Sequence, residues 1–176
     1  SSAASDVYKR QHYIDKKVDK SLLDEMLSAA NLAPSWKNSQ TPRFYVATGE
    51  KSKNAVREAL PEFNRKNSEN ASAYIVTTVV LNRSGFDKDG TAVTEIGNGW
   101  GYYDLGLNNM ALLLKATELG ISTLVMGIRD GEKLRKEFDI PETEAVVSVI
   151  AVGYTDSEIV RPKRKSVEDF AKFYED

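Results

Sequence analysis

The chain has 176 residues, 41% of them hydrophobic and 28% charged, with a formal net charge of -2. This composition fits a one-domain soluble globular protein and argues against a nucleic-acid binder, which would carry a basic excess. Cysteine is absent and His12 is the single histidine, which disfavours disulfides, thiolate metal sites, a cysteine nucleophile and a Ser-His-Asp triad. We therefore predict no metal site and expect a cofactor to carry any difficult chemistry.

The hydropathy pattern gives no sign of a membrane protein. The longest apolar run, residues 73–81, has the length of a strand, whereas a bilayer-spanning helix needs about 20 apolar residues. The sequence also lacks a recognisable signal peptide. These features predict a cytoplasmic protein with no membrane partner.

Helix-like and strand-like segments alternate too irregularly for a regular βαβ series, which favours an α+β or a mixed α/β fold. The 73–81 run is apolar throughout, which predicts a strand covered on both faces. Residues 103–119 predict a helix that is apolar on nearly every face, so it has to be buried in the core or against a second subunit. The predicted elements are helix 21–32 with a capping box of Ser21 and Asp24, strand 43–47, helix 51–60, strand 73–81, helix 103–119, strand 122–126, helix 132–138, strand 145–154 and a last helix with a capping box of Ser166 and Asp169.

The connection APSWKNSQ, residues 33–40, carries more polar chemistry than a plain surface loop requires. Ser35 and Asn38 supply short donors and acceptors suited to the edge of a heteroaromatic ring. Trp36 is either a wall for a flat ring or a core aromatic. The segment 82–101, which holds five of the 11 glycines, is the expected mobile loop. Its GNGWG stretch lacks the G-x-G-x-x-G spacing of a dinucleotide-binding loop.

Two further features allow either a binding or a plain structural interpretation. The basic run from Arg161 to Lys165 is either a phosphate clamp or a solvated linker. Gly127 follows a predicted strand, where it allows close backbone approach to a ligand or simply ends the strand in a turn.

Three blocks, in this order, resemble the characteristic blocks of the nitroreductase family of FMN-dependent NAD(P)H oxidoreductases. The blocks are AANLAPSWKNSQTPRFYV, YYDLGLNNMALLLKATELGISTLVMG, and IPETEAVVSVIAVGY followed by basic residues and SVEDF. The resemblance runs from about His12 to the C-terminus. It implies a three-layer α/β/α fold, with a mixed, mostly antiparallel sheet flanked by helices, in a homodimer with FMN at the interface.

The resemblance also implies which residues contact the cofactor. The implied residues are Ser35 and Asn38 beside the flavin ring or ribityl chain; Asn64 at the pyrimidine edge; Met126 and Gly127 facing N5, with the Gly127 amide as donor; and Arg161, Lys163 and Arg164 on the phosphate. With a flavin in the site, we expect Trp36 to close the cofactor pocket, and Phe86 and Trp100 either to stack on the acceptor or only to pack. No side chain is assigned a catalytic role, because the chemistry takes place on the flavin.

The implied function is hydride transfer from NADH or NADPH through flavin N5 to a nitroaromatic, quinone or similar small acceptor, in ping-pong order. Two alternatives stay open. Another flavin reaction, reductive dehalogenation or enone reduction, is compatible with the same fold. A flavin-binding protein with little turnover is the alternative from a different functional class.

The N-terminal segment departs from the family pattern. Val7, Lys9 and Gln11 stand where the family has Arg-x-Ser-x-Arg/Lys, and the family pattern stops between Gln11 and His12. We therefore expect residues 1–11 to be non-native and residues 12–176 to form the FMN-binding domain. A separate departure lies in the 33–42 region, where Thr41-Pro42 stands in place of the usual Pro-Trp.

Overall fold

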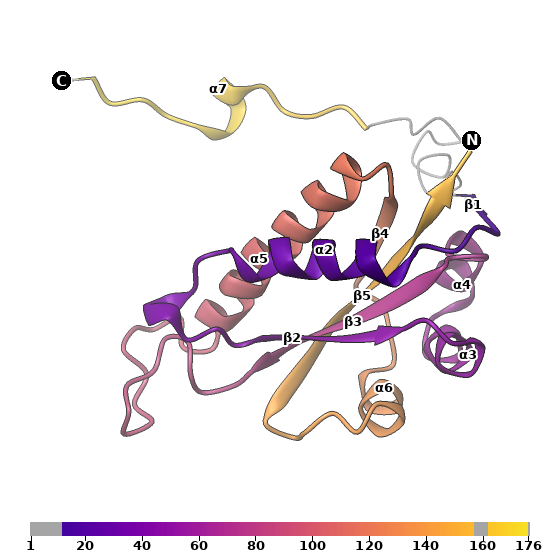
Figure 1. Cartoon of the computed structure of the whole chain (residues 1–176). Helices are drawn as coiled ribbons and strands as arrows, with labels where there is room; N and C mark the ends of the chain where they lie inside the picture. Colours follow the sequence, from indigo (N-terminus) through magenta and orange to yellow (C-terminus); the bar gives the residue numbers. More distant parts are fainter. Residues whose placement is uncertain (1–11, 157–161, 176) are drawn as a thin grey trace.

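The computed structural model describes residues 12–156 and 162–175 (Figure 1). Its middle layer is a sheet in the order β1-β5-β3-β2, with β4 paired to β5. All strand pairings in the described part are antiparallel, so the mixed character expected of the sheet is not seen there. The strands are β1 Tyr13–Ile14, β2 Pro42–Ala47, β3 Ala73–Val80, β4 Ser122–Met126 and β5 Glu144–Thr155.

Helices cover both faces of the sheet, which confirms the predicted α+β, three-layer architecture. Helices α2 and α5 lie on one face, while α3 and α6 lie on the other with α4 beside α3 (Figure 1). The helices are α2 Lys20–Asn31, a 3₁₀ turn η1 Trp36–Asn38, α3 Glu50–Glu58, α4 Glu62–Asn67, α5 Gly99–Glu118, α6 Gly131–Glu137 and α7 Val167–Phe170.

The two cores form because strand side chains alternate between the faces of the sheet. On β3, Ile75 packs beneath α2 and α5, whereas Tyr74 and Val76 pack on the α3 and α6 side. A β-bulge opposite Thr77 and Thr78 inserts one extra residue into β5. Because of this insertion Val146 and Val149, three residues apart, both join the same core. The prediction that β3 is covered on both faces is confirmed.

The two predicted capping boxes at helix starts have different outcomes. The capping box predicted at Ser21 is wrong, because α2 begins at Lys20 and its N-cap is Asp19, in extended conformation. Asp24 instead forms an ion pair with Lys20, one turn away, at 2.7 Å. The predicted capping box of Ser166 and Asp169 is confirmed, although α7 is a single turn. The sequence patterns missed α4, which is too short to show an apolar periodicity.

Helix α5 is not buried on every side in the single chain. Leu105, Leu112 and Ala116 face the core, but Tyr103 and Leu114 are 60% and 59% exposed on the outer side. Burial of the whole helix in the core is therefore excluded, and its burial against a second subunit stays a prediction. Within the described ranges, no helix combines the length and the apolar character needed to cross a membrane.

Candidate functional site

The 33–40 loop, which connects α2 to β2, has an unusual backbone. Lys37, Asn38 and Gln40 all adopt left-handed conformations, with φ of 46°, 56° and 50°. Such a conformation costs a non-glycine residue about 1–3 kcal/mol, so other contacts must hold it. Within the loop, the backbone amide of Gln40 donates a hydrogen bond to Ser35 Oγ at 3.0 Å. Outside it, the Trp36 amide donates to the buried carboxylate of Asp104 on α5.

Aromatic side chains gather where this loop meets the start of α5. The ring centroids of Trp36 and Trp100 are 4.8 Å apart, and Tyr103 adds an edge contact to Trp100 at 5.7 Å. Trp100 Nε1 donates to Thr94 Oγ1 at 2.7 Å, whereas the buried Trp36 Nε1 has no hydrogen-bond partner among the residues that the structure describes. The structure therefore brings together Trp36 and Trp100, one residue from the predicted cofactor set and one from the predicted substrate set.

The segment 82–101, which we call the glycine-rich loop, folds back on itself beside this aromatic cluster. Phe86 pairs with Ala92 in an isolated β-bridge, and the Val93 amide donates to Gly85 O at 2.8 Å. Phe86 is only partly buried. The predicted pocket residues Phe86 and Trp100 thus belong to one folded loop and helix start.

A cavity of about 420 Å³ opens beside the 33–40 loop, within the usual size range of small-molecule sites. Its apolar lining includes Leu27 and Phe44, and its polar lining includes Ser35, Gln40 and Asn108. The predicted cofactor residue Ser35 therefore borders a real hollow with mixed apolar and polar walls.

A second group of predicted residues meets at the end of β4. The Asn64 side-chain amide donates to Ile128 O at 3.1 Å, and Asn64 is 5% exposed. Gly127 is exposed, and a Cβ at this position would meet no atom within 4 Å. The Met126 side chain is buried in the core, so only its backbone is left to meet a ligand. Asn64 and Gly127 are thus neighbours at an open stretch of backbone.

The two groups lie far apart in the single chain. The 33–40 loop leads into β2, and Gly127 follows β4, which are the opposite edges of the β2-β3-β5-β4 sheet. At ~4.8 Å between strands, three spacings amount to roughly 14 Å. Figure 1 shows α4, which carries Asn64, at the far end of β2 from the 33–40 loop. One chain does not bring all predicted cofactor residues around one ligand.

The predicted phosphate residues join neither group. Lys163 and Arg164 are exposed, on the 162–175 segment that runs apart from the three layers in Figure 1. Arg161 lies outside the described residues. Among the described residues, no group of three or more His, Asp or Glu side chains is placed to hold a metal ion.

Sequence reasoning missed two buried carboxylates. Asp104 is 2% exposed within α5, and Glu144 is 6% exposed at the start of β5. Glu144 accepts hydrogen bonds from the hydroxyls of Tyr45 and Thr78. The pKa of Tyr45 is raised to about 12, mainly by desolvation of its hydroxyl and secondly by the hydrogen bond from this hydroxyl to Glu144. For Asp104 the available signal was an acidic residue inside an otherwise apolar helix, whereas Glu144 follows Glu142 and Thr143 and gave no such signal.

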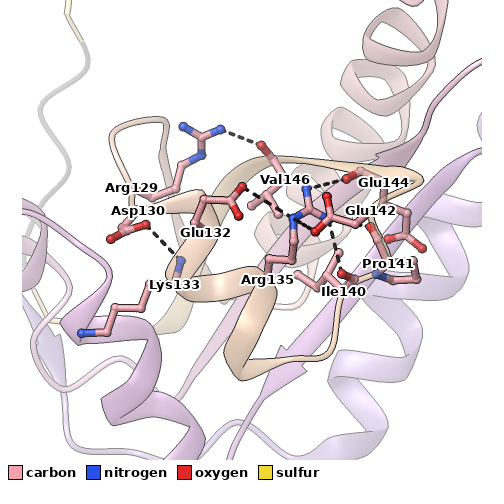
Figure 2. Close-up of polar contacts among 10 residues, drawn as sticks. All are labelled: Arg129, Asp130, Glu132, Lys133, Arg135, Ile140, Pro141, Glu142, Glu144 and Val146. Atoms are coloured by element: carbon pink, nitrogen blue, oxygen red, sulfur yellow. Dashed lines mark hydrogen bonds and ion pairs between the residues drawn. The ribbon is translucent and has the colours of Figure 1, made fainter.

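Arg135 has a structural role next to Glu144. Figure 2 shows its guanidinium inside the turn before β5, where it donates to Pro141 O at 2.5 Å and Glu144 O at 2.8 Å. Arg129 similarly donates to Val146 O at 2.6 Å. Because these guanidinium groups bind backbone carbonyls, we assign Arg135 to holding the turn before β5 and Arg129 to holding the backbone of β5, and neither to chemistry.

Comparisons with known proteins found solved structures that share the fold of this chain. Three solved structures share the fold: a nitroreductase family protein from Streptococcus pneumoniae TIGR4 (TM-score 0.77, 22% identity, 96% of this chain and 98% of that chain), an oxidoreductase containing FMN (0.78, 22%, 98% and 91%), and CLA-ER, an enone reductase of gut-bacterial fatty acid saturation metabolism (0.80, 20%, 93% and 91%). The search of curated proteins found no match.

The sequence model of the nitroreductase family matches residues 9–154. This range includes the 33–40 loop, Asn64 and Gly127, but not the basic segment after β5. It begins three residues before the predicted boundary at His12, which stays a prediction. The match covers most of the chain, and the chain belongs to the nitroreductase family.

Proposed function

We propose that this protein is an FMN-dependent oxidoreductase that takes hydride from NADH or NADPH and reduces a nitroaromatic, quinone or similar small acceptor in ping-pong order. The family match over residues 9–154 carries the proposal. A protein of the same fold is described as an oxidoreductase containing FMN, which supports the choice of cofactor.

The residues present fit such a cofactor. A flavin edge needs donors and acceptors, and the backbone amide of the exposed Gly127 is a donor at the end of β4. Asn64, whose side-chain amide is bonded to Ile128 O, holds the backbone beside it. No side chain blocks the backbone at Gly127, so a flat ring has room there. Lys163 and Arg164 provide the positive charge that a phosphate requires.

When bound, FMN would supply the electron carrier, accepting a hydride from the nicotinamide and giving electrons to the acceptor. The protein residues then bind, orient and exclude water. The Gly127 amide would donate a hydrogen bond to the ring, and Ser35 and Asn38 would line it. The Trp36 and Trp100 pair offers an aromatic surface on which a planar acceptor can stack.

We further propose that the working unit is a homodimer. The predicted cofactor residues fall into two groups at opposite sheet edges, so a site that uses both groups needs loops from two subunits. The exposed apolar face of α5, with Met110 52% and Leu114 59% exposed, is a surface that a second copy would cover. Phe170 and Phe173 in the C-terminal segment are also exposed, at 70% and 75%.

The double variant Met110→Glu, Leu114→Glu is therefore expected to be monomeric, because each subunit would bury two charges at the dimer interface. Sedimentation equilibrium of the wild-type and the double variant measures this. Lys136→Glu, an exposed position on α6 across the sheet, is the control and should leave the dimer intact. A monomeric wild-type protein would contradict the proposal.

Enone reduction is the second candidate, since CLA-ER shares the fold with a TM-score of 0.80. At 20% identity this likeness shows the fold alone. Parallel assays with a nitroarene, a quinone and an α,β-unsaturated ketone distinguish the acceptors.

The purified protein should be yellow, with flavin absorption, and should oxidise NADH or NADPH when an acceptor is present. FMN at 100-fold its Kd should also stabilise the fold by about 2.7 kcal/mol, measured as a rise in Tm. Bound flavin without turnover would favour the binding role. A colourless protein whose Tm does not respond to FMN would contradict the proposal.

A further inference from the structure

Asp104 is a buried carboxylate for which the proposed chemistry has no use. It lies in α5 and is 2% exposed. The Trp36 amide donates to both of its oxygens, at 3.2 and 3.1 Å. The Ser84 hydroxyl donates to Oδ2 at 2.5 Å. A buried acceptor thus holds one donor from the 33–40 loop and one from the glycine-rich loop.

Ser84 extends this anchor to the far end of the 33–40 loop. Its Oγ lies 2.6 Å from Ser39 Oγ and 3.1 Å from Thr41 Oγ1. Since the Ser84 hydrogen goes to Asp104, its oxygen lone pairs can accept from Ser39 and Thr41. Ser84 and Thr41 are each 1% exposed, so water does not compete for these bonds.

The two anchor points bracket the strained part of the loop. Lys37 and Asn38, both left-handed, lie between Trp36 and Ser39. A backbone in such conformations persists only where the surroundings determine it. The surface ion pair of Lys37 with Asp87, at 3.3 Å, is exposed and adds little.

We propose that Asp104 is a positioning residue that holds the 33–40 loop in its strained conformation. It acts directly on Trp36 and, through Ser84, on Ser39 and Thr41. The loop carries Ser35 and Asn38, so the consequence for flavin binding rests on the proposed function. The effect on the loop itself does not depend on any cofactor.

The two tryptophans of the chain provide a direct readout. Trp36 sits on the loop and Trp100 on α5, with ring centroids 4.8 Å apart and planes tilted by 44°. Two indoles so close and tilted should give an exciton couplet in the far-ultraviolet circular dichroism spectrum. Loss of the couplet reports that the loop has moved relative to α5.

In Asp104→Ala the couplet should fall by at least about half, and the Trp36 amide should exchange with deuterium about 10- to 100-fold faster, as expected for loss of bonds to a charged group. Asp104→Asn should rescue part of both signals, because its single oxygen can still accept from Trp36. Ser84→Ala, which keeps the direct bond to Trp36, should also be intermediate, and both conservative variants serve if Asp104→Ala does not fold.

Glu144→Gln is the matched control. Glu144 is a buried carboxylate that also accepts from two hydroxyls, but it packs on the α6 side of the sheet. The control should lower Tm and leave the couplet unchanged. If the couplet and the Trp36 exchange rate survive in the Asp104 and Ser84 variants while Tm falls as in the control, Asp104 only stabilises the fold and the proposal is wrong.

FMN titration separates this proposal from the proposed function. If the wild-type protein binds FMN, Asp104→Ala should raise its Kd about tenfold or more. An unchanged Kd with a lost couplet would overturn the link to flavin. A wild-type protein that does not bind FMN would contradict the proposed function, while loss of the couplet would still support the positioning role.

Discussion

A variant with alanine at both Lys163 and Arg164 is expected to bind FMN about 10²- to 10⁴-fold more weakly than the wild-type protein. Each side chain is proposed to donate charge-assisted hydrogen bonds to the phosphate, worth about 1.5–3 kcal/mol apiece, and each 1.4 kcal/mol is a factor of ten. Fluorescence titration of FMN measures the change. Because exposed charges are screened, the difference should be larger at low salt.

Lys172→Ala is the matched control for this variant. Lys172 is a cation on the same C-terminal segment, outside the basic run and exposed like Lys163 and Arg164. It should bind FMN as the wild-type protein does. If the double variant also keeps the wild-type Kd, the basic run is a solvated linker, the alternative that its sequence leaves open.

Alanine at Gly85 is expected to destabilise the protein by about 2–5 kcal/mol, through overpacking and a positive φ. Gly85 has a φ of 85°, and an added Cβ would lie 2.6 Å from Trp100 Cδ1 and 2.7 Å from Gly97 O. Since Gly97 O belongs to the backbone, relief requires the whole loop to move. Chemical denaturation measures the free energy of unfolding.

Gly90→Ala separates the two causes. Gly90 has nearly the same φ, 84°, but an added Cβ would meet no atom within 4 Å. It should therefore show only the backbone cost, about 1–2 kcal/mol. Equal losses in the two variants would mean that the close approach of the added Cβ to Trp100 and Gly97 O costs no stability.

The regular elements of the fold were predictable where the hydropathy period was long and unbroken. Strand β3, Ala73–Val80, lies within the apolar run 73–81, and strand β5, Glu144–Thr155, contains the predicted strand 145–154. Prediction failed for short elements such as α4, which has no room for a periodic pattern. It also failed at Ser21, because α2 begins one residue earlier, at Lys20, with Asp19 at the N-cap position.

The candidate site was predictable in part. The resemblance to the family predicts Ser35, Asn64 and Gly127 as cofactor residues, and Ser35 does border a cavity. Their role in binding a flavin stays a prediction. Their grouping was not predictable, since the strand order places β2 and β4 at opposite sheet edges. The role of Asp104 was also hidden, because its partners Trp36 and Ser84 are 68 and 20 residues away in the sequence.

Local chemistry alone established that this chain builds an α+β fold, lacks thiol chemistry, and carries the blocks of the nitroreductase family. The fold class and the lack of thiols follow from short-range periodicity and composition, whereas the family resemblance depends on the order and spacing of three sequence blocks. The pairing of Trp36 with Trp100, the anchoring of the 33–40 loop by Asp104 and the outward apolar face of α5 emerged only in the folded chain. Each depends on contacts between distant segments, and such contacts follow from the packing of the sheet and helices as a whole.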